Sequence, residues 1–347
     1  MAPPITRVAD WHGSYSMIID VRSPSEFADD HIPGAVNLPV LDDAQRDEVG
    51  TMYKQVGTFE AKRYGAALVA TNIATHLQTV LADKPRDFLP LIYCWRGGQR
   101  SGAMARIFSE IGWKVSVIEG GYKTYRKKVL DGLDALPSDL RLMILRGRTG
   151  TAKTQILRQA ERLGTQVIDL EGLASHRGSL LGSEPDHNQP SQRYFESQLH
   201  AVMQNLDPQR PVFVEAESNK IGSLHIPPAF WHQMRGAPSV ALSVPVAARV
   251  DFLIQDYAHI IQQPTRLDPL LDWVASRIGH AAVANWRDRL TSGDWHGFVT
   301  AVLNDHYDPA YARSAQAREY QQSGTLSANK LDEENIMKLA TELGKFR

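Results

Sequence analysis

Short apolar runs alternate along this chain with stretches of helical periodicity, and this alternation constrains the fold more than any other feature. In the first third, helical spacing marks Ser101–Ile111, and helix-forming residues that include Arg46–Gln55 fill residues 42–88. The apolar runs there are Met17–Val21, Ala35–Leu38, Pro90–Cys94 and Val115–Ile118. Buried strands that alternate with helices form mostly parallel sheets. The pattern therefore predicts an α/β domain whose helices cover a mostly parallel sheet.

A second α/β pattern follows. A helix is expected over Thr154–Leu163, and from about residue 250 the periodicity is helical and amphipathic. The apolar runs of this part are Arg141–Leu145, Gln166–Leu170, Pro211–Glu215 and Ser239–Val244. Asp131–Asp139 combines Gly, Pro and Asp without a clear period, which favours a linker. A chain of 347 residues suits two domains, expected at residues 1–132 and at residues 139–347 with a helical C-terminal region.

Charge and cysteine content exclude several classes of protein. The formal net charge is −1, unlike that of a strongly basic nucleic-acid binder, although the patch Arg126–Lys128 leaves room for a polyanionic partner. A single cysteine rules out a disulfide scaffold and fits a reducing cytosol. The chain shows neither a basic and apolar leader after Met1 nor a run of about 18 apolar residues. We expect a cytoplasmic protein without a membrane span.

The lone thiol lies in a loop suited to a reactive anion. Cys94 ends a predicted strand, and a predicted helix begins at Ser101. Backbone N–H groups and a helix N-terminus in such a loop stabilise negative charge, and the nearby arginines and glycines should help to lower the thiol pKa. We take Cys94 as the catalytic thiol, with an anion-binding loop of Trp95, Arg96, Gly97, Gly98, Gln99 and Arg100. The alternative is a buried structural cysteine at a strand end.

A glycine-rich turn after the strand Arg141–Leu145 has the context of a phosphate-binding loop. Its residues are Gly147, Arg148, Thr149, Gly150, Thr151, Ala152, Lys153 and Thr154. In such a loop the backbone N–H groups wrap phosphate oxygens, Lys153 supplies positive charge, and the Thr154 hydroxyl can reach Mg²⁺. Ala152 stands where the usual pattern has glycine, and alanine disfavours a positive φ. We expect phosphate binding rather than ordinary ATP binding, assign no metal-ligand residues, and keep a chance glycine-rich turn as the alternative.

Motifs on either side of Cys94 resemble those of the rhodanese family. They are Asp20-Val21-Arg22, Glu26-Phe27, the run His31–Pro39 and the run Val117–Tyr122. The resemblance covers about residues 5–130 and implies a carrier of sulfur or selenium. The spacing from Cys94 to Arg100 is one residue longer than in the usual rhodanese loop. Cysteine phosphatases share this longer spacing, and there the cysteine attacks phosphorus. The spacing leaves both chemistries open.

Three further segments, with Cys94-Trp95-Arg96-Gly97-Gly98, resemble the tRNA 2-selenouridine synthase family over about residues 5–260. The segments are Asp169–Ser179, Gln189–Ser197 and Glu215–Gly222. The resemblance implies a rhodanese-like domain joined to a P-loop domain. It implies as substrates a tRNA with 2-thiouridine at the wobble position, geranyl diphosphate and selenophosphate, with no tightly bound cofactor. An enzyme that supplies selenophosphate is a further implied partner.

The family's chemistry proceeds in two steps. Geranyl diphosphate alkylates the sulfur of 2-thiouridine, and selenium from selenophosphate then replaces the geranylthio group to give 2-selenouridine. The phosphate loop would stabilise the departing diphosphate. By the resemblance, Cys94 would carry selenium as a perselenide, and Arg96 and Arg100 would hold selenophosphate.

Six charged residues of the second half are further candidates for orienting a substrate. They are Asp169, Glu171, His176, Arg177, Glu215 and Arg249. All but Arg249 lie at or just past the end of a predicted strand, where α/β proteins bind ligands. Arg249 is expected to close over a phosphate. The simpler interpretations are a salt-bridged turn at His176 and Arg177, a solvated Glu215 and a surface Arg249. The sequence does not locate an apolar pocket for the geranyl group.

Three other functions compete with this interpretation. The first is a cysteine phosphatase with a regulatory P-loop domain, which the Cys94–Arg100 spacing supports. The second is a sulfurtransferase whose P-loop hydrolyses ATP, against which Ala152 counts. The third is a non-catalytic module that binds tRNA or protein, which the reactive thiol loop disfavours.

Overall fold

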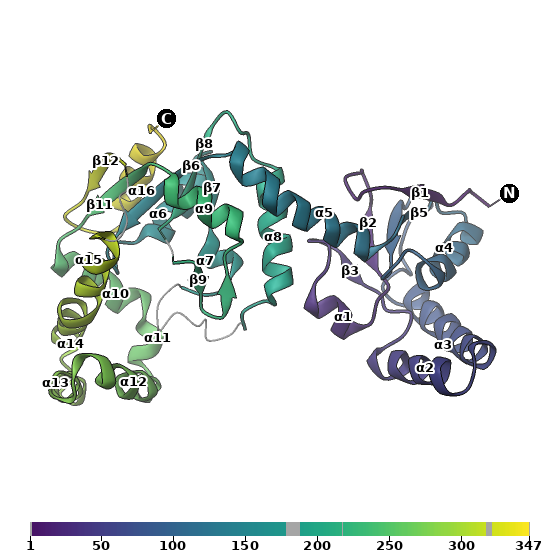
Figure 1. Cartoon of the computed structure of the whole chain (residues 1–347), viewed down its shortest axis with the longest axis horizontal. Helices are drawn as coiled ribbons and strands as arrows, with labels where there is room; N and C mark the ends of the chain where they lie inside the picture. Colours follow the sequence, from purple (N-terminus) through teal and green to yellow (C-terminus); the bar gives the residue numbers. More distant parts are fainter. Residues whose placement is uncertain (1, 178–187, 217, 317–320, 347) are drawn as a thin grey trace. The chain divides into compact units, whose positions relative to one another are not determined.

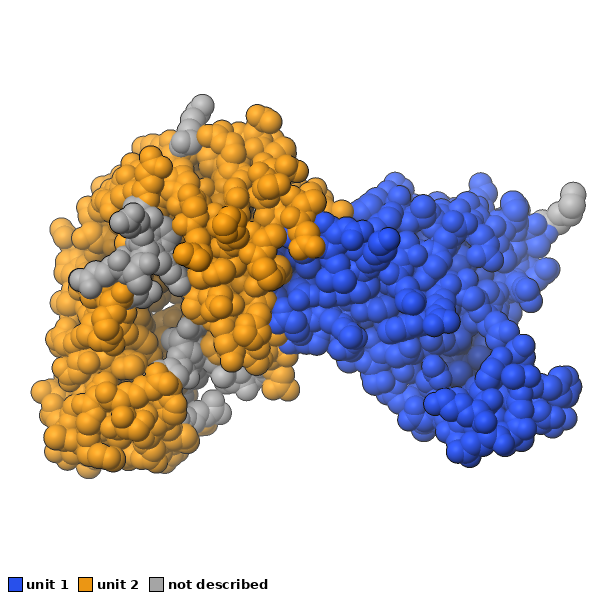
Figure 2. Space-filling model, in the orientation of Figure 1, with its two compact units in different colours: residues 1–133, 190–201 blue, residues 134–189, 202–347 orange. Residues whose placement is uncertain are grey.

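The computed structural model describes residues 2–177, 188–216, 218–316 and 321–346. The chain divides into two compact units (Figure 2). The first comprises residues 1–133 and 190–201, and the second comprises residues 134–189 and 202–347. No helix in the described ranges is long and apolar enough to cross a membrane.

The first unit is built on a five-stranded parallel sheet in the order β1-β5-β4-β2-β3 (Figure 1). The strands are β1 (Thr6–Val8), β2 (Met17–Asp20), β3 (Val36–Asn37), β4 (Pro90–Tyr93) and β5 (Ser116–Ile118). The helices are α1 (Pro24–Asp29), α2 (Asp43–Gln55), α3 (Thr58–Gln78), α4 (Gln99–Ile111) and α5 (Tyr122–Ala135). Every residue of β4 is buried, so both faces of the sheet are covered at the strand that leads to the thiol. The predicted α/β class is confirmed for this unit.

The second unit has its own parallel sheet, in the order β12-β11-β6-β8-β7. Its strands are β6 (Arg141–Gly147), β7 (Gln166–Ile168), β8 (Pro211–Glu215), β11 (Ser239–Ser243) and β12 (Gln322–Ser327). A two-stranded antiparallel hairpin consists of β9 (Lys220–Ile221) and β10 (Leu224–His225). Because β6 is central and its neighbours are parallel, the loop that follows it opens at the carboxyl edge of the sheet, where α/β proteins bind ligands.

Helices flank this sheet and form most of the C-terminal part. Those before the C-terminal part are α6 (Lys153–Arg162), α7 (Leu170–Leu173), α8 (Gln192–Gln204), which extends from the first unit, and α9 (Pro228–Gly236). The C-terminal ones are α10 (Val246–Asp256), α11 (Ala258–Ile261), η2 (Pro264–Leu267), α12 (Asp268–Ile278), α13 (His280–Thr291), α14 (Trp295–Val302), η3 (Leu303–Tyr307), α15 (Asp308–Gln316) and α16 (Glu333–Leu343). The predicted helical C-terminal region is confirmed, with one exception.

The exception is β12, which the helical pattern from about residue 250 did not predict. This strand pairs with β11 at the edge of the sheet, and of its six residues only Leu326 is buried. An exposed edge strand with the sequence QSGTLS shows no alternation of apolar and polar residues, so the sequence lacks the signal by which half-buried strands are recognised.

The expected linker at Asp131–Asp139 is instead helical. Helix α5 continues to Ala135 and a 3₁₀ turn, η1 (Leu136–Asp139), follows it. The buried residues of α5 recur with helical spacing, and the last of them is Leu133. Packing along this face outweighs the cost of about 1 kcal/mol that a glycine such as Gly132 imposes on a helix.

Residues 190–201 group with the first unit, although they follow the sequence-based boundary at residue 139. Arg193 Nη1 pairs with Asp29 Oδ2 at 2.7 Å, and Arg126 forms an ion pair with Glu196. A segment distant in the sequence thus becomes part of the unit that holds the thiol.

Candidate functional site

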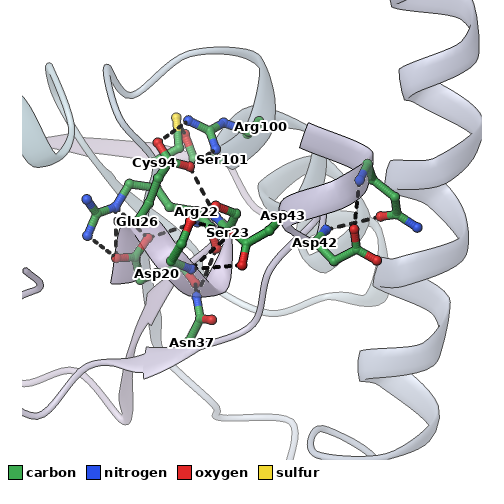
Figure 3. A network of polar contacts seen from close by, with 12 residues as sticks. Asp20, Arg22, Ser23, Glu26, Asn37, Asp42, Asp43, Cys94, Arg100 and Ser101 are labelled. Carbon is green, nitrogen blue, oxygen red and sulfur yellow. Dashed lines mark hydrogen bonds and ion pairs between the residues drawn. The ribbon is translucent and has the colours of Figure 1, made fainter. Parts of the chain in front are cut away.

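The thiol of Cys94 lies directly after β4 and accepts hydrogen bonds from the loop that follows (Figure 3). Its Sγ lies 3.3 Å from the backbone N of Gly98 and 3.3 Å from Oγ of Ser101. Burial alone would raise the pKa of Cys94, but these bonds and backbone N–H groups of Ser101 and Arg96 outweigh it. The pKa of Cys94 therefore lies below its ordinary value, in the predicted direction, and the loop stabilises a thiolate.

Glycines hold this loop against the segment after β5. Gly97 has φ +62°, and a Cβ there would lie 2.5 Å from the carbonyl oxygen of Ile118. Gly121 has φ +60°, and a Cβ there would lie 2.1 Å from the carbonyl oxygen of Cys94. Tyr122 N donates to the same oxygen at 2.8 Å. The thiol loop is thus in contact with the rhodanese-like run Val117–Tyr122. Neither glycine can be replaced without moving the thiol loop.

The arginines near the thiol are placed differently from one another. Arg100 forms a two-point ion pair with Glu26, with Nη1 2.6 Å from Oε2. Burial alone would raise the pKa of Glu26, but its bond to Arg100 lowers the pKa below its ordinary value. Arg96 is exposed and supplies its backbone N–H to the thiolate.

An open cavity of about 460 Å³ adjoins the loop. Its lining residues are Ser25, Glu26, Asp29, Arg46, Trp95, Arg100 and Arg193. Sequence reasoning missed Arg46 and Arg193, because they lie on α2 and α8, far in sequence from the thiol, and no motif marks them. Three arginines and one indole around a cavity suit a phosphate-bearing ligand.

The phosphate loop begins at the end of β6 and closes at the start of α6. Lys153 Nζ donates to the carbonyl oxygen of Gly147 at 3.1 Å, and Thr151 Oγ1 donates to that of Arg148 at 2.8 Å. Gly150 has φ +81°, and a Cβ there would lie 2.8 Å from Leu253 Cδ1. The loop is closed by its own hydrogen bonds and packed by α10, which presets its shape for an anion.

Ala152 adopts a left-handed conformation with φ +57° and is 6% exposed. The rest of the loop therefore imposes the glycine-type backbone on alanine, at a cost of about 1–2 kcal/mol. The loop therefore keeps the usual phosphate-loop backbone, although Ala152 stands where the usual pattern has glycine.

Two carboxylates meet at the hydroxyl of Thr154. Thr154 Oγ1 lies 2.7 Å from Glu171 Oε2 and 3.2 Å from Glu215 Oε2. Glu215 is 0% exposed and accepts the backbone N–H of Glu171 at 2.8 Å. The strand end of β8 and the first turn of α7 thereby supply oxygen atoms of the kind that bind Mg²⁺.

The other candidate residues fall into two groups. Asp169 caps α7 through the N–H of Gly172 and pairs with Arg158 at 2.7 Å, so its carboxylate is engaged in local structure. His176 and Arg177 line the phosphate-loop cavity, and Arg177 Nη1 pairs with Asp256 Oδ2 at 3.0 Å. Gly178, Ser179 and Glu217 of the family-like segments lie outside the described residues.

Arg249 is buried rather than on the surface, with 1% exposure. Its Nε donates to the carbonyl oxygen of Thr149 at 2.8 Å, and Nη1 and Nη2 pair with Asp308 at 3.0 and 2.7 Å. Asp308 also accepts from Arg148 at 3.0 Å. Arg249 therefore supports the phosphate loop from α10.

A cavity of about 600 Å³ opens on the phosphate loop. Its lining includes the loop with Glu171, His176 and Arg177. It also includes apolar and aromatic side chains, which are Phe252, Leu253, Tyr257, Tyr307 and Tyr311, beside Asp256 and Ala310. The cavity therefore combines an anion-binding loop with apolar and aromatic side chains.

Comparison with known proteins assigns the chain to a family. A family model described as the tRNA 2-selenouridine synthase AAA domain matches residues 140–341, and one for the rhodanese-like domain matches residues 6–128. The tRNA 2-selenouridine synthase of Nitrosomonas europaea is 31% identical over 92% of this chain and 86% of its own length. That of Shewanella denitrificans is 39% identical over 85% of this chain and 87% of its own length. A third, from Alcanivorax borkumensis, is 32% identical over 85% of this chain and 88% of its own length. With a thiolate loop in one unit and a phosphate loop in the other, this chain belongs to the tRNA 2-selenouridine synthase family.

Proposed function

We propose that this chain modifies the wobble uridine of tRNA, converting 2-thiouridine to 2-selenouridine by way of an S-geranyl intermediate. The family supports selenouridine formation on tRNA. The geranyl step rests on one observation above all, the cavity whose lining combines the phosphate loop with apolar and aromatic side chains. A prenyl diphosphate has the same two-sided chemistry.

The phosphate loop would act on the diphosphate of the donor. Backbone N–H groups of residues 150–154 and the ammonium of Lys153 would hold its oxygens and stabilise the charge that develops as it departs. The Thr154 hydroxyl and the carboxylates of Glu171 and Glu215 provide oxygen ligands that fit Mg²⁺. When bound there, Mg²⁺ would supply additional charge neutralisation.

The geranyl step balances without any redox partner. The sulfur of 2-thiouridine bonds to C1 of the geranyl group as the C1–O bond breaks. The electron pair of that bond leaves with the diphosphate, and the N3 proton of the base passes to water. The product carries sulfur as a thioether, which departs as a thiol in the next step.

In the selenium step, the Cys94 thiolate would attack the phosphoryl group of selenophosphate. A perselenide on Cys94, together with phosphate, would be two electrons more oxidised than a thiolate with selenophosphate, and the reaction includes no oxidant. We therefore propose that the Cys94 thiolate bonds to phosphorus as the P–Se bond breaks, and that water then hydrolyses the phosphocysteine to phosphate. Selenium bonds to C2 of the base, the C2–S bond breaks, and geranylthiolate takes a proton. The anion cavity beside Trp95 and Arg100 suits this phosphoryl transfer.

The deciding experiment is mass spectrometry of wobble nucleosides. Purified protein is incubated with thiolated tRNA and geranyl diphosphate, with and without selenophosphate. We expect S-geranyl-2-thiouridine in the absence of selenophosphate and 2-selenouridine in its presence. Failure to form either product would refute the proposal, and release of phosphate from a generic aryl phosphate instead would favour a phosphatase.

Two variants test the division between the sites. Cys94→Ala should accumulate the geranylated nucleoside and form no 2-selenouridine, because the thiolate acts only in the second step. Lys153→Ala should lose both products, because the second step depends on the first. Loss of geranyl transfer in the Cys94 variant would contradict the assignment of the two steps to separate sites.

A further inference from the structure

The C-terminal helices enclose a second, apolar pocket. Apart from Thr149, its lining comes from the elements α10 to η3, and nearly all of the surface that it exposes is apolar. Trp286 and Phe298 line it edge to face, with ring centroids 6.3 Å apart, and Trp295 meets Phe298 in the same way at 6.0 Å. The indole N–H of Trp286 donates to Asp305 at 3.2 Å, so this buried ring has its polar atom satisfied.

This pocket and the phosphate-loop cavity share part of their walls. Thr149, Leu253, Tyr257 and Tyr307 line both. Thr149 belongs to the phosphate loop itself, and Leu253 packs against Gly150 of the same loop. A ligand anchored by phosphate on the loop therefore has an apolar pocket beside it.

We infer that this apolar pocket receives the distal end of the prenyl chain and limits its length, an inference that rests on the proposed function. An apolar chain attached to a diphosphate gains by leaving water, and this pocket is a largely apolar space that shares lining residues with the loop cavity. Trp286 and Phe298 line the apolar pocket but not the phosphate cavity, which makes them residues that set chain-length specificity.

The volume of the pocket supports this assignment. It measures about 90 Å³, against about 150 Å³ for an engineered apolar cavity that binds benzene. Because it is smaller than that cavity, it holds at most one five-carbon isoprene unit, and the first unit of the chain would lie in the larger cavity. A third isoprene unit has no space unless the aromatic side chains move, and close-packed interiors resist such movement.

The test compares donors of three lengths on a thiolated anticodon stem-loop. Dimethylallyl, geranyl and farnesyl diphosphates carry one, two and three isoprene units. For the unmodified protein we expect kcat/KM to be highest with geranyl diphosphate. In Phe298→Leu and Phe298→Ala, which enlarge the pocket, the ratio of kcat/KM for farnesyl over geranyl diphosphate should rise at least tenfold. Phe298→Leu is the milder change and keeps the test valid if Phe298→Ala does not fold.

A blocking variant gives the opposite prediction. Val299→Phe places a ring in the pocket, and should raise the KM for geranyl diphosphate at least tenfold while leaving that for dimethylallyl diphosphate within twofold. The one-unit donor ends before the pocket, so its affinity reports on the phosphate loop alone.

Val283→Ala is the matched control. Val283 is 3% exposed and belongs to the same apolar cluster, but it does not line the pocket. If its effect on the donor ratio equals that of the Phe298 variants, or if those variants leave the ratio unchanged, the pocket is only packing and the inference fails. If the unmodified protein transfers no prenyl group from any donor, the proposed function itself fails.

Discussion

Arg249 donates from Nε to the carbonyl oxygen of Thr149 at 2.8 Å, so a buried arginine of α10 fixes the middle of the phosphate loop. Its remaining N–H groups pair with Asp308. Removing Arg249 leaves the Thr149 carbonyl without its donor and Asp308 with Arg148 as its remaining partner, at a cost of about 1–3 kcal/mol. We predict that Arg249→Met lowers the free energy of unfolding of the second unit by this amount and weakens binding of inorganic diphosphate. Urea unfolding and titration calorimetry measure the two effects.

The exposed Arg235 on α9 provides the control for this prediction. Arg235→Met should change stability by less than about 0.5 kcal/mol. If Arg249→Met retained both stability and diphosphate affinity, the supporting role of Arg249 would be wrong.

Ala152 is held with φ +57°, a conformation that glycine adopts without strain. We predict that Ala152→Gly raises the free energy of unfolding by about 1 kcal/mol, because relief of strain exceeds the added flexibility of the unfolded chain. Ala160→Gly, in the interior of α6, should lower it by about the same amount. Denaturant unfolding of both variants gives the comparison, and a loss of stability in both would show that Ala152 is not strained.

The thiolate of Cys94 depends on the hydroxyl of Ser101, which donates to Sγ at 3.3 Å. We predict that Ser101→Ala raises the pKa of Cys94, because burial is then opposed by fewer hydrogen bonds. The midpoint of the pH dependence of Cys94 alkylation should move to higher pH. Ser109→Ala on the same helix, whose hydroxyl bonds to the Pro3 carbonyl, should leave the midpoint unchanged. Equal midpoints in all three proteins would disprove the dependence.

Arg193 brings a positive charge from α8 to the cavity beside Trp95. We predict that Arg193→Ala slows formation of 2-selenouridine from the geranylated tRNA several-fold and makes the rate less sensitive to salt, since the cavity loses one of its three guanidinium groups. Geranyl transfer should be unaffected. The control is Arg63→Ala, at an exposed position on α3. If it slowed the reaction equally, the effect of Arg193 would come from general surface charge and not from the cavity.

Asp30 is a fully buried carboxyl group in the first unit. Burial raises its pKa from 3.8 to about 6, although the Tyr122 hydroxyl, which donates to Oδ2 at 2.8 Å, and the charge of Arg126 act in the opposite direction. Because the folded state holds the proton more tightly, this group costs stability as the pH rises through the window from about 4 to 6. Burial lowers the pKa of His200 to about 4, so its contribution has the opposite slope over a similar window.

Comparing the unmodified chain with Asp30→Asn isolates the contribution of Asp30 to the pH dependence of stability, because His200 is present in both proteins. From pH 4 to pH 7, the free energy of unfolding of the variant should rise by about 2 to 3 kcal/mol relative to that of the unmodified chain. Unfolding by urea at a series of pH values, followed by a probe in the first unit, gives this difference. Parallel stability curves would show that Asp30 does not titrate in this range.

The thiol loop and the phosphate loop could be predicted from the sequence because each is formed by residues that are close together in the chain. A strand, a glycine-rich turn and a helix start lie within about ten residues, and their backbone conformations follow from neighbouring residues. Cys94 with its loop and Lys153 with its loop therefore stand where the sequence predicts them. The α/β class followed from periodicity in the same way, whereas β12 did not, because an exposed edge strand carries little periodic signal.

Contacts between residues distant in sequence were decided only by the tertiary structure. Arg193 reaches the thiol cavity through the packing of α8, and Arg249 reaches Thr149 through the packing of α10. The left-handed φ of Ala152 opposes the preference of alanine, since the surrounding loop imposes it. The apolar pocket beside the loop arises where several helices meet. The sequence by itself determined the thiol loop and the phosphate loop, because short segments encode them, and long-range packing decided what surrounds those loops.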